Sequence, residues 1–420
     1  FKQKTAYEIG VRLVGSEMCI RDRYPSDVSA KIIVIGGGFA GATVARFLKR
    51  YAPRLQVTLV EPNPIFTACP FSNLVITGQR NLSQQQFSYR FLEAEGITVL
   101  HERAMGINTE TRQVALQNRD TLTYDKLVTA PGISLQWNAI QGYDQSASQV
   151  FPHAWLAGPQ TMLLRQQIMD MRDGGLIIIG APPNPFRCPP GPYERASLVA
   201  NYLTKYKPKS KVLILDPKDN FSKKSLFLDA WKTLYGGMVE WVGASDGGNI
   251  VEVRTATKTI KTDFDTFQPD VANIIPPQSA GTIAQQSGFA DASGWCPIDP
   301  LTFESKIHND VHILGDAAIA NAMPKSAFSA NAQAKVCALQ LKQILSNQEP
   351  ISTTLANTCY SLVAPDYGIS IAGVYRPGKY LDPVPGAGGI SPRDAKENTR
   401  KLEARYARDW FRAITSQTFG

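Results

Sequence analysis

The segment Ala30-Lys-Ile-Ile-Val-Ile-Gly36-Gly-Gly38-Phe-Ala-Gly41 is an apolar run that leads into the pattern G-x-G-x-x-G. Residues 42–50 are typical of a helix, and a second apolar run, residues 56–60, ends at Glu61. A strand, a glycine-rich turn and a helix, followed about 20 residues later by an acid, form the fingerprint of a dinucleotide-binding unit. The sequence therefore predicts an α/β fold with a parallel sheet.

Each fingerprint residue has an expected task. Gly36 allows the tight turn, and Gly38 allows the close approach of a pyrophosphate. Gly41 lets helix and strand pack closely, and Glu61 would hold a ribose hydroxyl. An ordinary glycine-rich turn is the alternative for the glycines alone.

Two later segments favour FAD as the dinucleotide. Residues 122–132 read as a strand followed by a turn of small residues, Ala130-Pro-Gly132, as in two-domain flavoprotein reductases. Residues 311–318 read as a strand that ends in Gly315-Asp316, and in that class the aspartate caps the ribityl chain. A helix over 326–346 would direct its N-terminal dipole at the flavin, where it favours the negative charge of the reduced ring.

A second fingerprint begins within residues 174–188 but loses its glycines. The apolar strand Leu176–Gly180 leads into Ala-Pro-Pro-Asn-Pro-Phe-Arg-Cys188. Proline has no N–H to offer a pyrophosphate, so this turn is not suited to gripping a nicotinamide nucleotide. The segment predicts a second nucleotide fold in which a cysteine lies in the turn that would otherwise bind the pyrophosphate.

The predicted architecture is two Rossmann-like domains of the FAD/NAD-linked reductase type plus a small C-terminal interface domain. Residues 30–149 and 291–350 are expected to form the FAD-binding domain. Residues 150–290 are expected to form the second nucleotide fold. Residues 351–420 are expected to cover the flavin and meet a partner. Residues 1–25 resemble translated sequencing-adapter read-through and are excluded from fold reasoning.

Charge and composition exclude several classes of function. The 420 residues carry a net charge of +8, but no run of Lys and Arg resembles a nucleic-acid patch. No apolar run reaches the roughly 18 residues of a spanning helix. The four histidines show no metal spacing. We therefore expect no nucleic acid, no membrane span and no metal site; a mild basic field can still steer an anion such as HS⁻.

Beyond residue 29, the chain resembles the flavoprotein subunit of flavocytochrome c sulfide dehydrogenase, a relative of the sulfide:quinone oxidoreductases. The resemblance extends from Ala30 to Gly420. Its most specific motifs are Phe66-Thr-Ala-Cys69-Pro-Phe-Ser-Asn73, Cys188-Pro-Pro-Gly-Pro-Tyr-Glu194-Arg and Ala356-Asn-Thr-Cys359-Tyr-Ser, together with the C-terminal tail.

The resemblance implies a role for three cysteines. Cys69 would attach FAD through an 8α-S-cysteinyl linkage; a small buried thiol is the alternative. Cys188 and Cys359, each expected in a proline- or turn-rich loop, would form a redox-active disulfide over the flavin. Sulfide would attack one sulfur, and the released thiolate would reduce the flavin. Two free cysteines or a structural bridge are the alternatives.

Two charged residues have open roles. Glu194 is expected in the first turn of a helix, where it would be either the base that deprotonates H₂S or an acid that balances the helix dipole. The resemblance favours the catalytic role. Lys325 would be either a cation near the flavin or a solvated loop lysine.

The resemblance implies an enzyme that oxidises sulfide and passes electrons to a c-type cytochrome subunit in a heterodimer. This chain has no C-x-x-C-H, so the haem is expected on the partner. A periplasmic location is expected, because disulfides persist in oxidising compartments. The main alternative is a membrane-peripheral sulfide:quinone oxidoreductase whose amphipathic helix 394–414 lies on the bilayer instead of docking on its own domain. A non-catalytic flavin module fits the cysteines less well, and an NADH-dependent reductase is disfavoured by the prolines.

Overall fold

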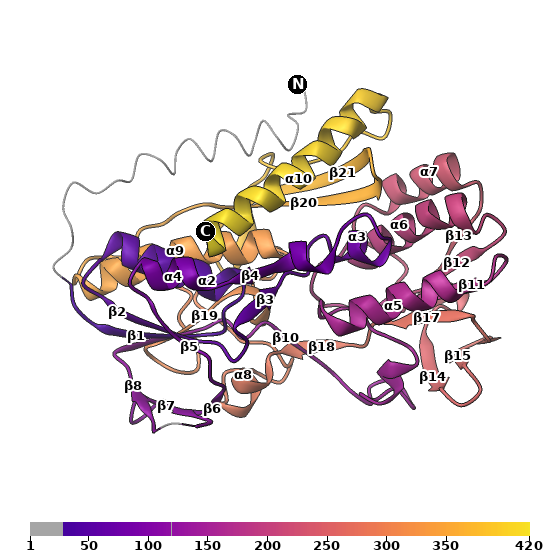
Figure 1. Cartoon of the computed structure of the whole chain (residues 1–420). Coiled ribbons are helices and arrows are strands. Elements are labelled where there is room, and N and C mark those ends of the chain that lie inside the picture. Colours follow the sequence, from indigo (N-terminus) through magenta and orange to yellow (C-terminus); the bar gives the residue numbers. More distant parts are fainter. Residues whose placement is uncertain (1–27, 119) are drawn as a thin grey trace.

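The computed structural model describes residues 28–118 and 120–420 (Figure 1). The adapter-like segment 1–25 lies outside the described residues. Two parallel sheets lie at opposite ends of the molecule, and an antiparallel hairpin with a long helix extends over both. The predicted α/β fold class is confirmed.

The first parallel sheet carries the fingerprint. Four of the five residues of its central strand β1 are buried, as expected of a strand covered on both faces. Gly36 follows β1 directly and starts the turn into the helix. In spatial order the strands are β19 (Val311–Ile313), β9 (Lys126–Thr129), β1 (Lys31–Ile35), β2 (Gln56–Val60) and β5 (Thr98–Leu100).

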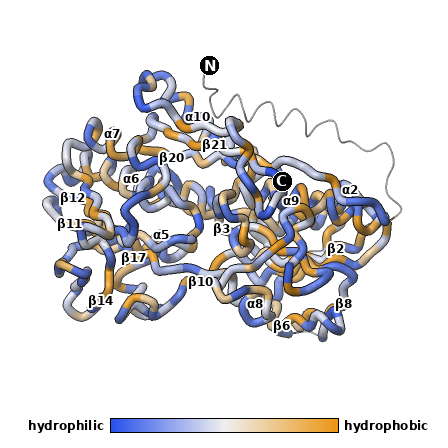
Figure 2. The backbone as a smooth tube through the Cα atoms, turned by 180° about the vertical axis from the view of Figure 1, so that it is seen from behind, coloured by the Kyte–Doolittle hydropathy of each residue, from blue (hydrophilic) through white to orange (hydrophobic). Residues whose placement is uncertain are grey.

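Two helices pack together beside this sheet. Helix α2 (Phe39–Tyr51) begins directly after Gly38, and helix α9 (Ala327–Leu345) begins after the Gly-Asp turn. Figure 2 shows hydrophobic stretches of the backbone in the regions of both sheets. Both helices therefore start at the carboxyl edge of the sheet, where ligands bind in open α/β folds.

The second parallel sheet repeats this plan. Its strands, in spatial order, are β13 (Val239–Val242), β12 (Lys211–Leu215), β11 (Leu176–Gly180) and β17 (Val271–Ile274). Its helices are α5 (Pro159–Asp170), α6 (Gly191–Tyr206) and α7 (Lys224–Tyr235). Helix α6 is buried along most of its length and faces the C-terminal hairpin.

The carboxylate of Asp216, which follows β12, is hydrogen-bonded by side chains of the protein itself. Asp216 follows β12 as Glu61 follows β2, and its side chain is 0% exposed. Its carboxylate accepts hydrogen bonds from the Tyr193 hydroxyl at 2.5 Å, the Trp241 indole at 3.0 Å and the Lys218 ammonium group at 2.5 Å. This carboxylate is therefore already satisfied inside the second nucleotide fold.

The C-terminal region corrects two expectations. Cys359 lies in the middle of a strand, not in a turn-rich loop, because residues on both sides of it pair with the next strand. The last helix, α10 (Glu397–Phe419), begins three residues later and ends five residues later than predicted. The antiparallel sheet consists of β20 (Leu355–Ala364), β21 (Tyr367–Pro377), β22 (Leu381–Pro383) and β23 (Gly389–Ile390).

Helix α10 docks on the chain itself. Its buried residues include Ala404, Ala407, Phe411 and Ile414, and it packs against β20, β21 and α2. Leu402 of the same helix is exposed although it is apolar. Within residues 28–118 and 120–420, no helix is both long and apolar enough to cross a bilayer.

Small elements complete the fold. The β10–β18 pair lies between the two parallel sheets (Figure 1). The remaining strands are β3 (Ile65–Thr67), β4 (Gln86–Ser88), β6 (Ala104–Asn108), β7 (Gln113–Leu116), β8 (Leu122–Thr123), β10 (Ile133–Leu135), β14 (Ile250–Arg254), β15 (Thr259–Thr262), β16 (Thr266–Phe267) and β18 (Gln278–Ala280). The short helices are α3 (Ser72–Ile76), α4 (Arg90–Ala94) and α8 (Thr282–Gln286).

Candidate active site

One cavity of about 790 Å³ is lined by residues of both parallel sheets' loops, the hairpin and α10. Eleven of the predicted site residues line it: Gly36, Gly38, Glu61, Cys69, Ala130, Gly132, Cys188, Glu194, Gly315, Asp316 and Cys359. Gly41 and Lys325 do not line the cavity. Gly41 packs against Gly36 and Lys325 binds Asp316, and both of these partners line it. The fold thus gathers segments that are far apart in the sequence around one space.

The fingerprint glycines are required by their surroundings. Gly36 has φ +95°, and a Cβ there would lie 2.4 Å from the carbonyl oxygen of Ala130. A Cβ on Gly41 would lie 1.8 Å from the carbonyl oxygen of Gly36. Glu61 accepts a hydrogen bond from the Gly37 N–H at 2.9 Å, which holds the acid at the rim of the turn.

The Gly-Asp turn presents an unpaired carboxylate oxygen to the cavity. Asp316 Oδ1 is buried and has no hydrogen-bond partner among the described residues, and burial raises the pKa of this carboxyl. A sugar or ribityl hydroxyl would supply the missing donor. Ser326 and Ala327, at the N-terminus of α9, line the same cavity. These residues, with the fingerprint turn, fit FAD.

Lys325 fastens the Gly-Asp turn. Its ammonium group donates to the carbonyl oxygens of Asp316 and Ala318, both at 2.8 Å, and lies 3.8 Å from the ring centroid of Trp295. Burial lowers the pKa of Lys325 to about 8. The interpretation as a solvated loop lysine is therefore wrong. A position at the flavin edge has no support either, since the residue does not line the cavity.

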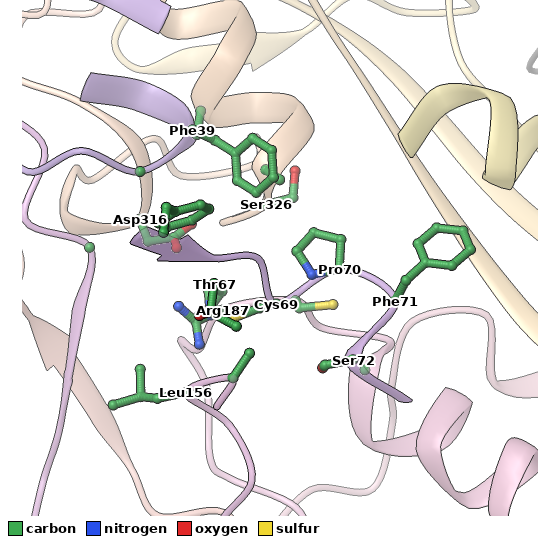
Figure 3. A pocket seen from close by; sticks show the side chains of 18 of the residues that line it. Phe39, Thr67, Cys69, Pro70, Phe71, Ser72, Leu156, Arg187, Asp316 and Ser326 are labelled. Carbon is green, nitrogen blue, oxygen red and sulfur yellow. The ribbon is translucent and has the colours of Figure 1, made fainter. Parts of the chain in front are cut away.

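The side chains of Cys69 and Arg187, both labelled in Figure 3, bind the same backbone carbonyl group, that of Trp155. The Cys69 thiol donates to the oxygen of Trp155 at 3.6 Å, and the Arg187 guanidinium donates to the same oxygen. Cys69 is half-buried and its side chain faces the cavity. The thiol is thus accessible from the space that the fingerprint turn borders.

Cys188 and Cys359 line the same cavity, and both are free thiols, like the other cysteines of the described residues. Cys188 has the positive φ of +57°, which is uncommon outside glycine, and its N–H donates to the Lys325 oxygen at 2.8 Å. Burial raises the pKa of both thiols, and the negative charge of Glu194 adds to this effect. The positive charge of Lys223 opposes it at both thiols. Both thiols therefore lie in a buried setting that also contains Glu194 and Lys223.

Glu194 lies in the first turn of α6, as predicted, and also faces the cavity. Its carboxylate accepts from the Leu362 N–H at 3.0 Å and from the Asn73 amide at 3.5 Å. Burial raises its pKa, an effect that these hydrogen bonds and the charges of Lys223 and Arg195 oppose. The raised pKa makes this carboxylate a stronger base than an exposed glutamate.

Three further residues shape the site, and sequence reasoning gave them no role. The Asn357 amide donates to the Cys359 sulfur at 3.3 Å. Arg195 is buried and donates to Asn73 Oδ1 at 3.0 Å. Lys223 is buried and donates to the Cys359 carbonyl oxygen at 2.8 Å. Asn73, Arg195 and Asn357 lie inside the quoted motifs, so the motifs were a usable signal for them; Lys223 had none.

No metal centre is evident. Across the described ranges, no cluster of three or more His, Cys, Asp or Glu side chains is arranged to hold a metal ion. The polar groups of the cavity instead surround sulfur atoms and the unpaired carboxylate oxygen of Asp316. The site is arranged for a dinucleotide and thiol chemistry.

Three family models match parts of the chain. Residues 30–163 match the pyridine nucleotide-disulphide oxidoreductase model. Residues 161–276 match the central part of the sulfide dehydrogenase (flavocytochrome c) flavoprotein chain, and residues 351–419 match the flavin-binding part of flavocytochrome c sulphide dehydrogenase. The three matches follow one another along the chain and include the loops that carry Cys69 and Cys188 and the strand that carries Cys359. The Gly-Asp turn and the start of α9 lie between the second and third matches.

Similar proteins belong to two related groups. The mitochondrial sulfide:quinone oxidoreductase of Mus musculus is 22% identical over 335 residues, 76% of this chain and 72% of that protein. The structure of the sulfide:quinone oxidoreductase of Aquifex aeolicus superposes with a TM-score of 0.72 at 14% identity, covering 92% of each chain. That likeness supports the fold.

The flavoprotein chain of sulfide dehydrogenase (flavocytochrome c) from Chlorobaculum thiosulfatiphilum is 51% identical over 45 residues, which are 11% of this chain and 94% of that sequence. Two consecutive models of the same group match the second sheet and the C-terminal region. The chain therefore belongs to the family of the flavoprotein chains of flavocytochrome c sulfide dehydrogenase.

Proposed function

We propose that this protein is a flavin-dependent sulfide dehydrogenase that oxidises sulfide at the Cys188–Cys359 pair and passes electrons to a c-type cytochrome subunit. The observation that carries the proposal is the shared cavity, in which two thiols and a buried carboxylate face the dinucleotide fingerprint. The name of the family and those of its relatives support sulfide as the substrate.

The first step is thiol–disulfide exchange on the oxidised form of the pair. HS⁻ forms a bond to one cysteine sulfur, the bond between Cys188 and Cys359 breaks, and its electron pair leaves on the other sulfur as a thiolate. The sulfide sulfur becomes part of a persulfide, and the pair is reduced by two electrons. FAD, when bound, can take up those two electrons and release them singly, as a haem acceptor requires.

Glu194 supplies the proton acceptor for this step. H₂S must lose a proton before it attacks, and a base with a pKa raised toward neutrality does this most effectively. Burial raises the pKa of Glu194, and the carboxylate faces the same cavity as both thiols. The hydrogen bond from the Leu362 N–H orients the carboxylate beside the strand that carries Cys359.

We further propose that Cys69 attaches FAD covalently. Its half-buried thiol faces the cavity near the fingerprint turn, and Gly38, Asp316 and the N-terminus of α9 border the same space. A covalent link would retain the flavin while electrons leave one at a time.

The acceptor has two candidates. A c-type cytochrome is favoured by the family and by the packing of α10, which buries Ala404, Ala407, Phe411 and Ile414 against the chain itself instead of presenting them to a bilayer. A quinone is the second candidate, because Phe71, Phe328 and Trp410 form an apolar part of the cavity lining. The cytochrome route fits the expected periplasmic location, which we retain as a proposal.

Anaerobic stopped-flow mixing tests the function. The flavin-loaded protein is mixed with sulfide, and the flavin absorbance is followed before either a soluble c-type cytochrome or decylubiquinone is added. Bleaching by sulfide with fast reoxidation by the cytochrome is the expected result. Faster reoxidation by decylubiquinone would show that a quinone is the acceptor instead of a cytochrome. If sulfide does not bleach the flavin, the proposal that sulfide is the substrate is wrong.

A further inference from the structure

Lys223 occupies an unusual place for a lysine. It is 4% exposed and precedes α7 with φ +64° and ψ +27°, the left-handed region that L-residues seldom adopt. Burial of a long cationic side chain is rare unless the charge is paired. A strained backbone and a buried charge at one residue indicate that the rest of the fold requires the ammonium group at this position.

The ammonium group is fixed to the strand that carries Cys359. Lys223 Nζ donates to the carbonyl oxygen of Cys359 at 2.8 Å and to the hydroxyl of Ser361 at 2.9 Å. Side chains two residues apart on a strand point to the same face. The Ser361 hydroxyl therefore places the ammonium group on the face of β20 from which the Cys359 sulfur projects.

Asn357 completes that face from the other side of the cysteine. Its amide donates to the Cys359 sulfur at 3.3 Å, and its oxygen accepts from the hydroxyls of Ser326 at 2.6 Å and Ser329 at 3.1 Å. The amide is therefore oriented with its N–H toward sulfur. Two groups that favour negative charge, an ammonium group and an amide N–H, thus flank one thiol along β20.

The surroundings of Lys223 hold few charges. The groups that influence it are the Cys359 and Cys188 thiols, Glu194 of α6 and Glu403 of α10. Burial lowers the pKa of Lys223, and these groups oppose that shift. In turn the positive charge of Lys223 lowers the pKa of the Cys359 thiol against the effect of burial.

We propose that Lys223 is a positioning residue for the cysteine pair, whose ammonium group, held by the Cys359 carbonyl and the Ser361 hydroxyl, favours the thiolate form of Cys359. The inference deepens the proposed function and rests on it, because a stabilised thiolate is what sulfide attack on the disulfide must release. A thiolate leaves more readily when its conjugate acid is stronger.

Alkylation of the reduced, flavin-loaded protein tests this without any turnover. Iodoacetamide is applied over a range of pH, and mass spectrometry measures the modified fraction of the peptides carrying Cys359 and Cys188. In Lys223→Gln, which keeps N–H donors but loses the charge, the Cys359 midpoint should rise by about one pH unit, a roughly tenfold loss of reactivity below it. Lys223→Arg should restore the wild-type midpoint.

Lys232→Gln is the matched control, because it removes an exposed lysine from α7 itself and should leave the midpoint unchanged. An unshifted Cys359 midpoint in folded Lys223→Gln would overturn the proposal. An alkylation midpoint for Cys188 below that of Cys359 in the wild-type protein would also overturn it. This second measurement needs no variant, so it applies even if Lys223→Gln does not fold.

The outcome is independent of the substrate. If sulfide does not bleach the flavin but the Cys359 midpoint shifts in Lys223→Gln, the proposed function fails and the role of Lys223 stands. If sulfide bleaches the flavin and the midpoint does not shift, only the role of Lys223 fails.

Discussion

The carboxylate of Glu194 accepts the backbone N–H of Leu362 at 3.0 Å, and Leu362 lies three residues after Cys359 on β20. The hydrogen bond joins α6 of the second nucleotide fold to the C-terminal hairpin. It keeps one carboxylate oxygen beside β20, the strand that carries Cys359. Helix α6, which carries Glu194, begins three residues after Cys188. The acid is thus placed relative to both sulfur atoms by backbone elements.

Replacement of Glu194 by Gln should lower the rate of sulfide oxidation by about 100-fold, the lower range of general-base contributions. Because burial raises the pKa of Glu194, the wild-type rate should increase with pH through a range above that of an ordinary glutamate. This limb should vanish in the variant. Pre-steady-state flavin reduction over a pH series measures both effects.

Glu397→Gln is the control for this substitution. Glu397 also lies in the first turn of a helix, α10, but is exposed and is not among the residues that line the cavity. Its loss should leave the pH profile unaltered. An unchanged profile in Glu194→Gln as well would assign Glu194 to the helix dipole instead of catalysis.

Acid precipitation should carry the flavin colour into the pellet. The peptide that contains Cys69 should then show the added mass of FAD, since its thiol faces the cavity. In Cys69→Ala the colour should remain in the supernatant. Colour in the supernatant of the wild type would leave Cys69 as a packing thiol and strengthen the quinone-linked alternative.

Asp316→Ala should weaken FAD binding by about ten- to a hundredfold, the equivalent of one hydrogen bond to a charged group. The unpaired Oδ1 has no other donor among the described residues, so its loss removes an interaction with the ligand only. Equilibrium titration with FAD in the Cys69→Ala background measures the dissociation constant. Asp246→Ala, at an exposed position in the second domain, should bind FAD like the parent.

Gly41→Ala should destabilise the protein by about 1–3 kcal/mol, the usual penalty of overpacking a tight contact. The added Cβ would lie 1.8 Å from the Gly36 oxygen and force the fingerprint turn to move. Flavin content should fall with the stability. Gly106→Ala, whose added Cβ has nothing within 4 Å, should change neither the denaturation midpoint nor the flavin content.

Local patterns in the sequence predicted the first sheet and the fingerprint closely. The strand before Gly36, the helix after Gly38 and the strand before Glu61 depend on apolar runs and glycines whose meaning is local. The helix after Asp316 was likewise found within one residue at each end. Such elements can be predicted from the sequence because each has a clear hydrophobic periodicity and a recognisable first residue.

The C-terminal hairpin was missed for a physical reason. Strand β20 alternates poorly because both of its faces are buried, one with polar residues such as Asn357 and Ser361 that bind other side chains. Buried polar residues on one face remove the alternation of apolar and polar residues by which a half-exposed strand is found in a sequence. Lys223 was missed for a related reason: beside Lys224 it resembles a solvated pair, and only the tertiary fold reveals that it is buried.

The position of Cys359 on a late strand has a consequence for biosynthesis. A ribosome makes the chain from the N-terminus, so the first sheet and Cys188 emerge well before β20. Until that strand docks between α6 and α9, Cys188 has no neighbouring thiol and the fingerprint turn has no cover from the hairpin. Maturation of this flavoprotein should therefore be a late event, completed only when the hairpin closes over both nucleotide folds.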